Sequence, residues 1–231
     1  MSPMNPRLLR PLARRQAPAP APTDPYFANV SLLLHFDTGF TDSSSLNASV
    51  TPGGDASIAT TDSKFGIGSA YFDGSGDGIS FSDFAIGTGD FTIEMWVKRI
   101  GSTIYAQLFG NEGSGVGFTF LINNNDNAGQ LGLYSTAGGI MDSGSNVCQA
   151  GQWVHIALTR SAGTVRFFVD GTQANQAADS SSYSGDSAFV GTNNVYAGRD
   201  YEGYIDELRV TKGVARYTES FSPPTAAFPN Q

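Results

Sequence analysis

Few residues of this 231-residue chain could act as an enzymatic nucleophile or bind a phosphate. The histidines are His35 and His155, no Gly-x-Ser-x-Gly turn is present, and the single cysteine, Cys148, lies in a glycine-rich connection with no basic residue nearby in sequence. Gly74-Ser-Gly76 precedes no helical pattern, so it offers no helix N-terminus to a phosphate. One cysteine also permits neither an internal disulfide nor a cysteine-based zinc cluster.

Carboxylates are the other source of catalysis that the sequence offers. A retaining glycoside hydrolase needs two carboxylates roughly 5 Å apart, one as general acid and one as nucleophile. The nearest candidates are Asp200-Tyr-Glu202 and Asp206-Glu207, which fall in a loop and at the start of a strand, and Glu94, which is alone on its strand. This arrangement does not suit hydrolysis, and we predict that the protein is not an enzyme.

Asparagine and tyrosine side chains are candidates for binding sugars. The run Asn123–Asn127 could ligate an ion or bond sugar hydroxyls, but Asn and Asp tolerate left-handed backbone. We therefore expect this run to be a hairpin connection between strands that end at Ile122 and begin at Gln130. Five tyrosines near strand ends or loops could stack on sugar rings, and the sequence does not choose among them: Tyr105, Tyr134, Tyr183, Tyr196 and Tyr201.

The elements that position these residues are predicted to be strands. Short runs of β-branched and aromatic residues alternate with Gly, Asn, Asp and Ser clusters, and the 28 glycines and 15% charged residues argue against a helical bundle. Turn signals every eight to twelve residues, such as Asp170-Gly171, indicate an all-β, two-sheet antiparallel sandwich or barrel. The expected strands are Val30–Phe36, Ala70–Asp73, Ile79–Phe81, Phe91–Arg99, Ile104–Phe109, Gly117–Ile122, Gln130–Tyr134, Trp153–Arg160, Thr164–Asp170, Asn194–Ala197 and Gly203–Thr211.

Alternation within the strands predicts which face each residue occupies. Phe91–Arg99 and Thr164–Asp170 each have one apolar face and one mixed face, as two packed sheets require. By the same rule Asp206 shares a face with Leu208 and Val210 and is expected to point toward the core. A buried carboxylate must be paired, hydrogen-bonded or bound to a cation.

Two interpretations of Asp206 follow from this burial. Calcium prefers six to eight oxygen ligands, and loops rich in Gly and Asp supply carboxylates and carbonyls. Alternatively, Asp206 or Glu207 forms a buried salt bridge with Arg209 or Arg216, or Asp206 accepts hydrogen bonds from loop amides.

Charge is distributed unevenly along the chain. The net charge is -8, but removing the four arginines of the first 22 residues leaves nine basic against 21 acidic side chains. An acidic body is repelled by phosphate backbones, which argues against nucleic-acid binding. No apolar run has the roughly 20 residues of a membrane-spanning helix. The arginines concerned are Arg7, Arg10, Arg14 and Arg15.

Residues 1–25 are predicted to be an extended arm, and residues 26–231 a single folded domain. The Pro/Ala alternation from Ala17 to Pro22 forbids a helix and favours polyproline-like backbone. A cleaved signal peptide is disfavoured, because Pro11, Arg14 and Arg15 interrupt its apolar stretch. Two interpretations stay open: a flexible, solvated arm, or one that docks on an acidic or grooved partner.

Three ordered segments together resemble one family. They are Tyr71–Gly78 with Gly89–Val97, then Gly151–Arg160 with Phe168–Gly171, and then Gly203–Thr218 with Phe221–Pro224. Over roughly residues 28–228 the chain resembles the concanavalin A-like, laminin-G-type jelly roll. The resemblance implies two curved antiparallel sheets that bind glycan or protein partners on rim loops or on the concave face.

The resemblance also implies roles for individual residues. Trp96, Trp153 and His155 are expected to be framework residues. A structural calcium ion in this fold would pair Asp37 with Asp206. Hydrolases of the same fold place three carboxylates on one strand as Glu-x-Asp-x-x-Glu, a pattern that this chain lacks.

The first and last segments are most similar to the members found in bacteriophage structural proteins. These segments are Val30–Asp37, Val214–Tyr217 and Phe221–Pro224. This implies a non-enzymatic, multi-copy or oligomeric virion protein, a capsid decoration or tail accessory, that contacts other virion proteins through its arm and displays a sandwich able to bind host glycans. The alternatives are a free-standing or secreted carbohydrate-binding lectin and a fold-related glycosidase.

Overall fold

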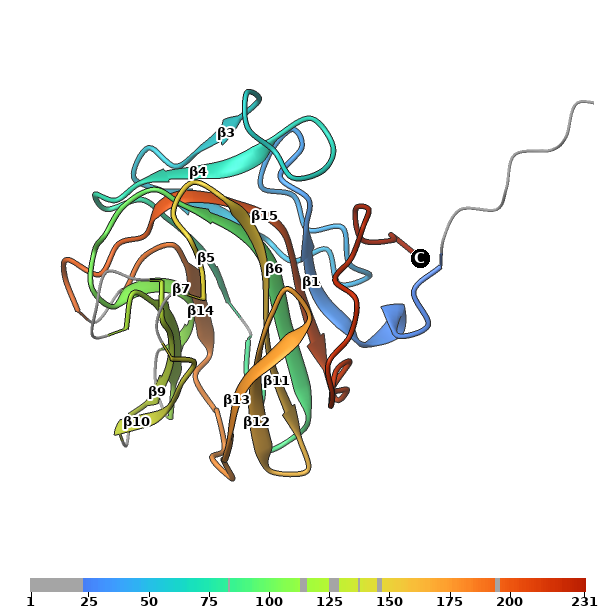
Figure 1. The fold of residues 1–231 in the computed structure, drawn as a ribbon. Coiled ribbons are helices and arrows are strands. Elements are labelled where there is room, and N and C mark those ends of the chain that lie inside the picture. Colours follow the sequence, from blue (N-terminus) through green and yellow to red (C-terminus); the bar gives the residue numbers. More distant parts are fainter. Residues whose placement is uncertain are drawn as a thin grey trace, which may run out of the picture.

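Alternating apolar residues form strands that pair into two antiparallel sheets, packed face to face (Figure 1). The computed structural model describes residues 23–82, 84–112, 116–124, 129–136, 138–144, 147–193 and 196–231, without the side chains of Asn111 and Glu112. The arm residues Arg7, Arg10, Arg14 and Arg15 lie outside the described residues. The predicted all-β sandwich is confirmed.

The larger sheet has eight strands and the smaller sheet seven. In the larger sheet the order is β13 (Thr172–Ala178), β12 (Thr164–Val169), β11 (Trp153–Ser161), β6 (Phe91–Arg99), β15 (Glu202–Lys212), β4 (Ser69–Asp73) and β3 (Ser57–Ala59), and β1 (Val30–Leu34) also pairs with β15. In the smaller sheet the order is β10 (Gly138–Asp142), β9 (Leu131–Ser135), β8 (Phe118–Ile122), β7 (Ala106–Glu112), β14 (Ser187–Val190), β5 (Gly78–Ser82) and β2 (Thr51–Gly53). A single 3-10 turn, η1 (Phe27–Asn29), precedes β1.

The core fills the space between the two sheets. The apolar face of β6 meets apolar residues of β8, and across the layers the rings of Phe120 and Phe167 stack 5.3 Å apart. Burial of such side chains is the main driving force for this fold. The outer face of each sheet is the face turned away from the other sheet.

Most predicted strands are confirmed, and the exceptions have physical reasons. The strand expected over Asn194–Ala197 lies partly outside the described residues, and Tyr196 and Ala197 form a bend and turn. β13 was not predicted because its sequence, Thr-Gln-Ala-Asn-Gln-Ala-Ala, lacks apolar alternation. It is an edge strand, which can be polar because one side has no strand partner. Four further unpredicted strands are β2, β3, β10 and β14.

A bulge in β15 overturns the predicted orientation of Asp206. The register between β15 and β6 shifts between Asp206 and Arg209, and Glu207 inside the bulge has φ = 50°. β15 has one extra residue at this bulge, and a shift by one residue exchanges the two faces of a strand, so the alternation is reversed beyond it. Ile205 and Leu208 point into the core, whereas Asp206 lies opposite Trp96 on the outer face. The prediction that Asp206 shares a face with Leu208 was therefore wrong.

Both ends of the described chain lie together on the outer face of the eight-stranded sheet (Figure 1). The backbone N–H of Asp24 donates to the carbonyl oxygen of Gln231 at 2.7 Å. The Asp24 carboxylate also accepts hydrogen bonds from Arg209 and Arg216. Asp24, near the end of the predicted arm, therefore contacts the sandwich directly. No helix in the described ranges is long and apolar enough to span a membrane.

Candidate functional site

The two predicted calcium ligands meet the backbone of one loop. Asp206 Oδ2 accepts hydrogen bonds from the N–H groups of Lys64 and Phe65 at 2.7 and 3.0 Å, and Asp37 Oδ1 accepts one from Ile67 at 2.6 Å. Gly66 makes this close approach feasible, because its φ is +60° and a Cβ there would lie 1.9 Å from Asp37 Oδ1. The structure thus contains the loop-amide arrangement that the sequence left open as an alternative.

Asp206 retains one carboxylate oxygen that could accept a proton or a cation. The residue is completely buried, and its Oδ1 atom has no hydrogen-bond partner among the residues that the structure describes. Burial raises the pKa of Asp206 to about 7, although the amide hydrogen bonds from Phe65 and Lys64 act in the opposite direction. An orphaned buried acceptor of this kind fits a cation such as calcium.

Among the described residues, a different trio of carboxylates is close enough together to share a metal ion. Ligand atoms of Asp55, Asp73 and Asp77 all lie within 4.8 Å of one another. Asp77 is buried, and its two oxygens accept hydrogen bonds from the backbone N–H groups of Asp55 and Asp73 at 2.7 and 2.9 Å. In the sequence, Asp73-Gly74 and Asp77-Gly78 are turn signals, and this group was not predicted as a site. Both Asp77 oxygens accept hydrogen bonds from the backbone, so the three carboxylates lie close together because they stabilise the turn, and no metal ion is needed to account for their arrangement.

Glu94, the isolated carboxylate on its strand, is enclosed by cationic partners. Arg209 donates to its Oε1 from Nε and Nη2 at 2.9 and 2.7 Å, and Tyr217 and His155 contact Oε2 at 2.9 and 3.2 Å. Burial alone would raise the pKa of Glu94, but the Arg209 charge and the His155 hydrogen bond hold it at about 2. Because Glu94 is fully buried, it has no surface on which a substrate could bind.

The salt bridges expected for Glu207 form with other partners. Glu207 accepts a hydrogen bond from His35 Nδ1 at 2.8 Å and from the backbone N–H of Phe228. Arg209 and Arg216 instead bind Asp24, and Arg209 also binds Glu94. These pairings were invisible in the sequence, since Asp24 lies 185 residues from Arg209.

The remaining acidic candidates and the expected framework residues have structural contacts. Asp200 accepts hydrogen bonds from the Thr192 hydroxyl and the Gly76 amide. Trp96 and His155 are buried, with ring centroids 5.3 Å apart, and half-buried Trp153 donates to Asp62. These positions fit the framework role predicted for the three aromatic residues.

Three of the five candidate tyrosines gather on the outer face of the seven-stranded sheet. Tyr105, just before β7, meets Tyr134 of β9 edge to face at 6.2 Å. The Arg199 guanidinium lies over the rings of Tyr105 and Tyr196, at 5.2 and 4.3 Å from their centroids. We call Tyr105, Tyr134, Tyr196 and Arg199 the tyrosine face. The other two candidates, Tyr183 and Tyr201, are buried in the core and cannot stack on a ligand.

Side-chain and backbone hydrogen bonds hold the tyrosine face in place. Gln107 of β7 donates its backbone N–H to the Arg199 carbonyl at 2.8 Å, and its side chain accepts a hydrogen bond from Asn193. Asn193 in turn accepts one from the Tyr196 N–H. The Gln107 Nε2 atom has no acceptor and lies over Gly110, where a Cβ would come within 2.4 Å of it.

Tyr105 has a backbone conformation that bulky residues rarely adopt. Its φ is +61°, and its N–H donates to the Asn123 carbonyl at 3.1 Å. On the same face the Tyr134 hydroxyl donates to Asn124, which lies over Gly132. The described part of the asparagine run, Asn123 and Asn124, joins β8 to β9 as predicted. Residues 125–127 lie outside the described residues.

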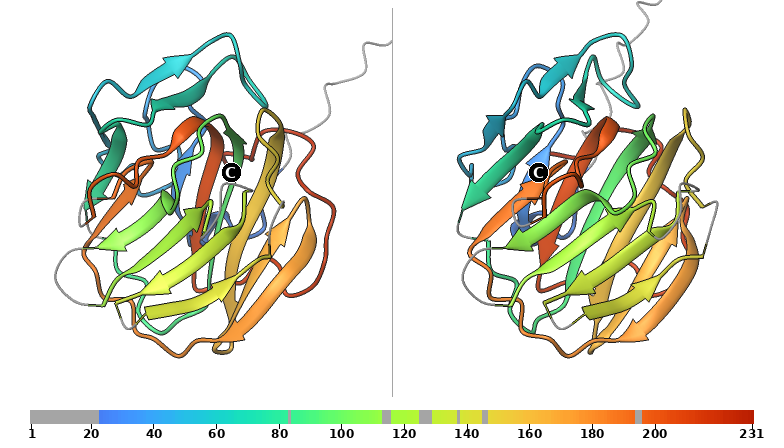
Figure 2. Two further views of the ribbon diagram at one scale, coloured as in Figure 1. Left: turned by 60° about the vertical axis from the view of Figure 1, so that its left-hand side comes forward. Right: turned by 90° about the vertical axis from the view of Figure 1, so that its left-hand side faces the viewer.

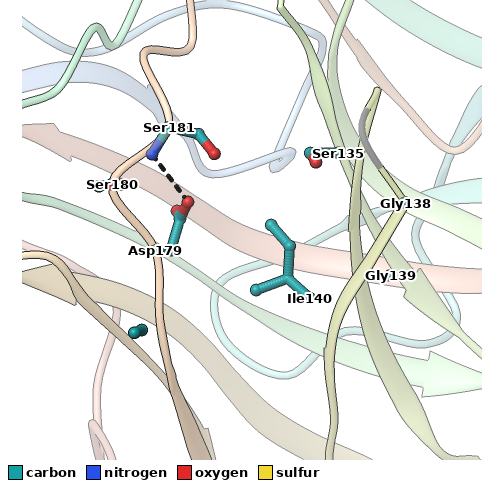
Figure 3. A pocket seen from close by; sticks show the side chains of 8 residues that line it. Ser135, Gly138, Gly139, Ile140, Asp179, Ser180 and Ser181 are labelled. Carbon is teal, nitrogen blue, oxygen red and sulfur yellow. Dashed lines mark hydrogen bonds between the residues drawn. The ribbon is translucent and has the colours of Figure 1, made fainter.

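A pocket of about 350 Å³ opens elsewhere, between β10 and the segment that follows β13. Figure 3 shows Ile140 and Ser135 on one side of it and Asp179 to Ser181 on the other. Asp179 accepts hydrogen bonds from Arg160 and Tyr183, so its charge is already compensated. This pocket presents no free charged group and is a weaker candidate than the tyrosine face.

Comparison with known families agrees with the fold. The model of the concanavalin A-like lectin/glucanases superfamily, laminin G type, matches residues 73–218, more than half of the chain. The chain belongs to this family. No curated protein matches it. The resemblance inferred from the three sequence segments is therefore confirmed.

Solved structures of the same fold include sugar-binding and receptor-binding proteins. Domain 4 of AbnA, a GH43 extracellular arabinanase from Geobacillus stearothermophilus in complex with arabinotriose, is 20% identical, with a TM-score of 0.62 over 81% of this chain and 94% of that domain. The botulinum neurotoxin type G receptor-binding domain is 15% identical, with a TM-score of 0.52, 84% coverage of this chain and 49% of that one. A Trypanosoma rangeli sialidase is 16% identical, with a TM-score of 0.57, 89% coverage of this chain and 34% of that one. The chain therefore spans half or less of the last two proteins, and the likeness establishes a lectin-like sandwich fold.

Proposed function

We propose that this chain is a non-enzymatic structural protein of a bacteriophage particle, a capsid decoration or tail accessory protein, whose sandwich binds host glycans. One observation carries the proposal. The two sheets are opposite layers of the sandwich, and the described chain begins at the outer face of the eight-stranded one (Figures 1 and 2). The tyrosine face is built on the other sheet, because Tyr134 belongs to β9 and Tyr105 directly precedes β7. A protein held at its N-terminus would therefore present the tyrosine face away from its attachment point.

The chemistry of the tyrosine face supports sugar binding. Tyrosine rings pack on the apolar faces of sugars, and amide and guanidinium groups bond hydroxyls with defined directions. Tyr196 is 55% exposed, and Gln107 and Asn193 order the connection that carries it. Weak binding at one such face would become effective through many copies on one particle, since multiple linked sites raise avidity.

The arm supports attachment to other virion proteins. It has four arginines and no acidic residue in 22 positions, and its prolines restrict the unbound chain. Docking an extended segment costs conformational entropy, which prior stiffening reduces. Arg7, Arg10, Arg14 and Arg15 would pair with carboxylates on an acidic virion surface.

Deleting residues 1–22 tests the attachment. We expect the truncated protein to keep the melting temperature of the full chain but to be lost from purified particles when it replaces the full chain during phage assembly. A variant with the four arm arginines changed to glutamine is the matched control for charge, and it should also be lost. Normal incorporation of the truncated protein would refute the anchoring proposal and favour a free-standing lectin.

A tyrosine substitution tests the sugar-binding part. We expect Tyr196→Ala to weaken binding on a glycan array by about two- to tenfold, because an aromatic packing contact is worth about 0.5–1.5 kcal/mol. Tyr26→Ala is the control, since Tyr26 is 42% exposed beside Arg216 on the other sheet. Turnover of any polysaccharide by the full chain would instead support the glycosidase alternative.

We also propose calcium as a structural cofactor, with Asp206 and Asp37 as its protein ligands. The orphaned Oδ1 of Asp206 is the observation that favours this. When bound, the ion would supply the positive charge that this buried carboxylate lacks. Asp206 would contribute an oxygen from β15, and Asp37 one from the segment after β1. The ion would thus link these two segments beside the 60–68 loop, whose amides already bind both carboxylates.

A further inference from the structure

Arg199 forms no salt bridge with any carboxylate in the part of the chain that the structure describes. Cation–π contacts with Tyr105 and Tyr196 hold its guanidinium, and among the described residues no carboxylate or other acceptor receives any of its five N–H donors. The neighbouring Asp200 forms no salt bridge with it; its two oxygens accept hydrogen bonds from Thr192 and Gly76 instead. The bidentate donor geometry of arginine is therefore available on the tyrosine face.

Other arginines of the sandwich are used differently. Arg160, Arg209 and Arg216 each bind a buried carboxylate, and Arg99 donates to the backbone carbonyls of Cys148 and Gly101. In a chain whose net charge is -8, acidic partners for Arg199 are plentiful. An unpaired guanidinium in such a protein is a place where a ligand can supply the anion.

The position of Arg199 is defined by its surroundings. Gln107 binds the Arg199 carbonyl through its backbone N–H and binds Asn193 through its side chain, and Asn193 binds the backbone N–H of Tyr196. Gln107 is fully buried, and its Nε2 atom, which has no partner among the described residues, lies over Gly110. The guanidinium and both rings are thus pre-organised, which lowers the entropy lost on binding.

We infer that the tyrosine face binds an acidic saccharide, with the sugar carboxylate on Arg199 and a sugar face against Tyr196. This inference rests on the proposed glycan-binding function and adds the charge of the ligand. Arginine–carboxylate pairs are bidentate and stronger than neutral hydrogen bonds. A single carboxylate suits the site better than a dense polyanion, because the rest of the sandwich is strongly acidic and repels extended negative charge.

Matched acidic and neutral probes test the inference on the full chain. Isothermal titration would compare trigalacturonate with its carboxyl-reduced form, and sialyllactose with lactose, and heparin would serve as the polyanion. We expect at least one acidic probe to bind at least about tenfold more tightly than its neutral counterpart, and heparin to bind no better than that probe. The two pairs distinguish a uronic from a sialic-type carboxylate.

Substitutions identify the group responsible. Arg199→Gln should remove the acidic preference with only a small change in melting temperature, because among the described residues its side chain makes no hydrogen bond or salt bridge and only the two cation–π contacts are lost. Arg199→Lys should retain only part of the preference, since it keeps the charge without the bidentate donors. Arg166→Gln is the control for net charge, because Arg166 lies on β12 of the other sheet.

The outcomes separate this inference from the proposed function. Equal binding of acidic and neutral probes, or an acidic preference that survives Arg199→Gln, overturns the inference and leaves glycan binding intact. Absence of binding to these probes and to a broad array of neutral and acidic glycans overturns both.

Discussion

The backbone N–H of Asp24 donates to the carbonyl oxygen of Gln231, which joins the start of the described chain to its last residue. The Asp24 carboxylate also lies between Arg209 and Arg216, 3.0 Å from Arg209 Nη1 and 2.7 Å from Arg216 Nη2. Burial alone would raise the pKa of Asp24, but the hydrogen bonds from Arg216 and from the Tyr26 amide lower it overall. Asp24 is therefore where the arm ends and the sandwich begins.

Truncations on either side of Asp24 should differ in stability. We expect deletion of residues 1–22 to leave the free energy of unfolding unchanged, whereas deletion of residues 1–24 should reduce it by about 2 kcal/mol, the usual contribution of charge-assisted hydrogen bonds. Urea unfolding followed by tryptophan fluorescence would measure this. Asp24→Asn in the full chain should resemble the longer deletion. Equal stability of the two truncations would show that Asp24 contributes nothing to the sandwich.

Glu94→Gln should be strongly destabilising. Arg209, His155 and Tyr217 would face a neutral amide in a buried site, and breaking a buried ion pair costs about 3–5 kcal/mol. Glu219→Gln, at an exposed position, is the charge-matched control and should change the unfolding free energy by less than about 0.5 kcal/mol. A small effect of Glu94→Gln in urea unfolding would contradict this account.

The same network predicts a loss of stability in acid. Because the pKa of Glu94 is lowered from 4.5 to about 2, its contribution is fully present above pH 4.5 and disappears as the pH falls toward 2. We expect the wild-type protein to lose stability over this interval more steeply than Glu94→Gln, which has no carboxylate to protonate there. Parallel stability–pH curves for the two proteins would rule out a dominant role for Glu94.

Two glycines with the same backbone angle should respond differently to alanine. Gly171 and Gly151 have φ of +75° and +74°. A Cβ at Gly171 would lie 1.9 Å from the Phe221 carbonyl oxygen, whereas a Cβ at Gly151 would have no described neighbour within 4 Å. We expect Gly151→Ala to cost about 1–2 kcal/mol for its conformation. Gly171→Ala should cost about 2–5 kcal/mol, because the C-terminal segment must also move. Thermal unfolding of both variants would measure the difference.

Chelation tests the calcium proposal. If Asp206 and Asp37 hold the ion, EDTA should lower the melting temperature relative to excess calcium chloride, because a ligand that binds only the folded state stabilises it. Asp206→Asn should abolish this response, and Asp73→Asn should retain it. Loss of the response in Asp73→Asn alone would place the ion at Asp55, Asp73 and Asp77, and an EDTA-insensitive wild-type protein would end the proposal.

Most strands of the sandwich could be predicted from the sequence, because alternation and turn residues are properties of neighbouring positions in the chain. The strand predicted over Phe91–Arg99 has the bounds of β6, since strong alternation and flanking turn residues lie within nine positions. β13 escaped prediction because a polar edge strand obtains its structure from the neighbouring β12. The bulge at Glu207 escaped it because the reversal of faces depends on pairing with β6, which is distant in the chain.

The sequence by itself determined an acidic, all-strand domain, its family and a set of five tyrosines that could bind sugars. Only the tertiary structure decided that Tyr105, Tyr134 and Tyr196 come together while Tyr183 and Tyr201 are buried. It also decided that Arg199 lies beside them without a carboxylate partner among the described residues. Alternation along a strand is encoded by neighbouring residues. The partners across a sheet come from segments up to almost 200 residues apart, and their contacts exist only when the chain has folded.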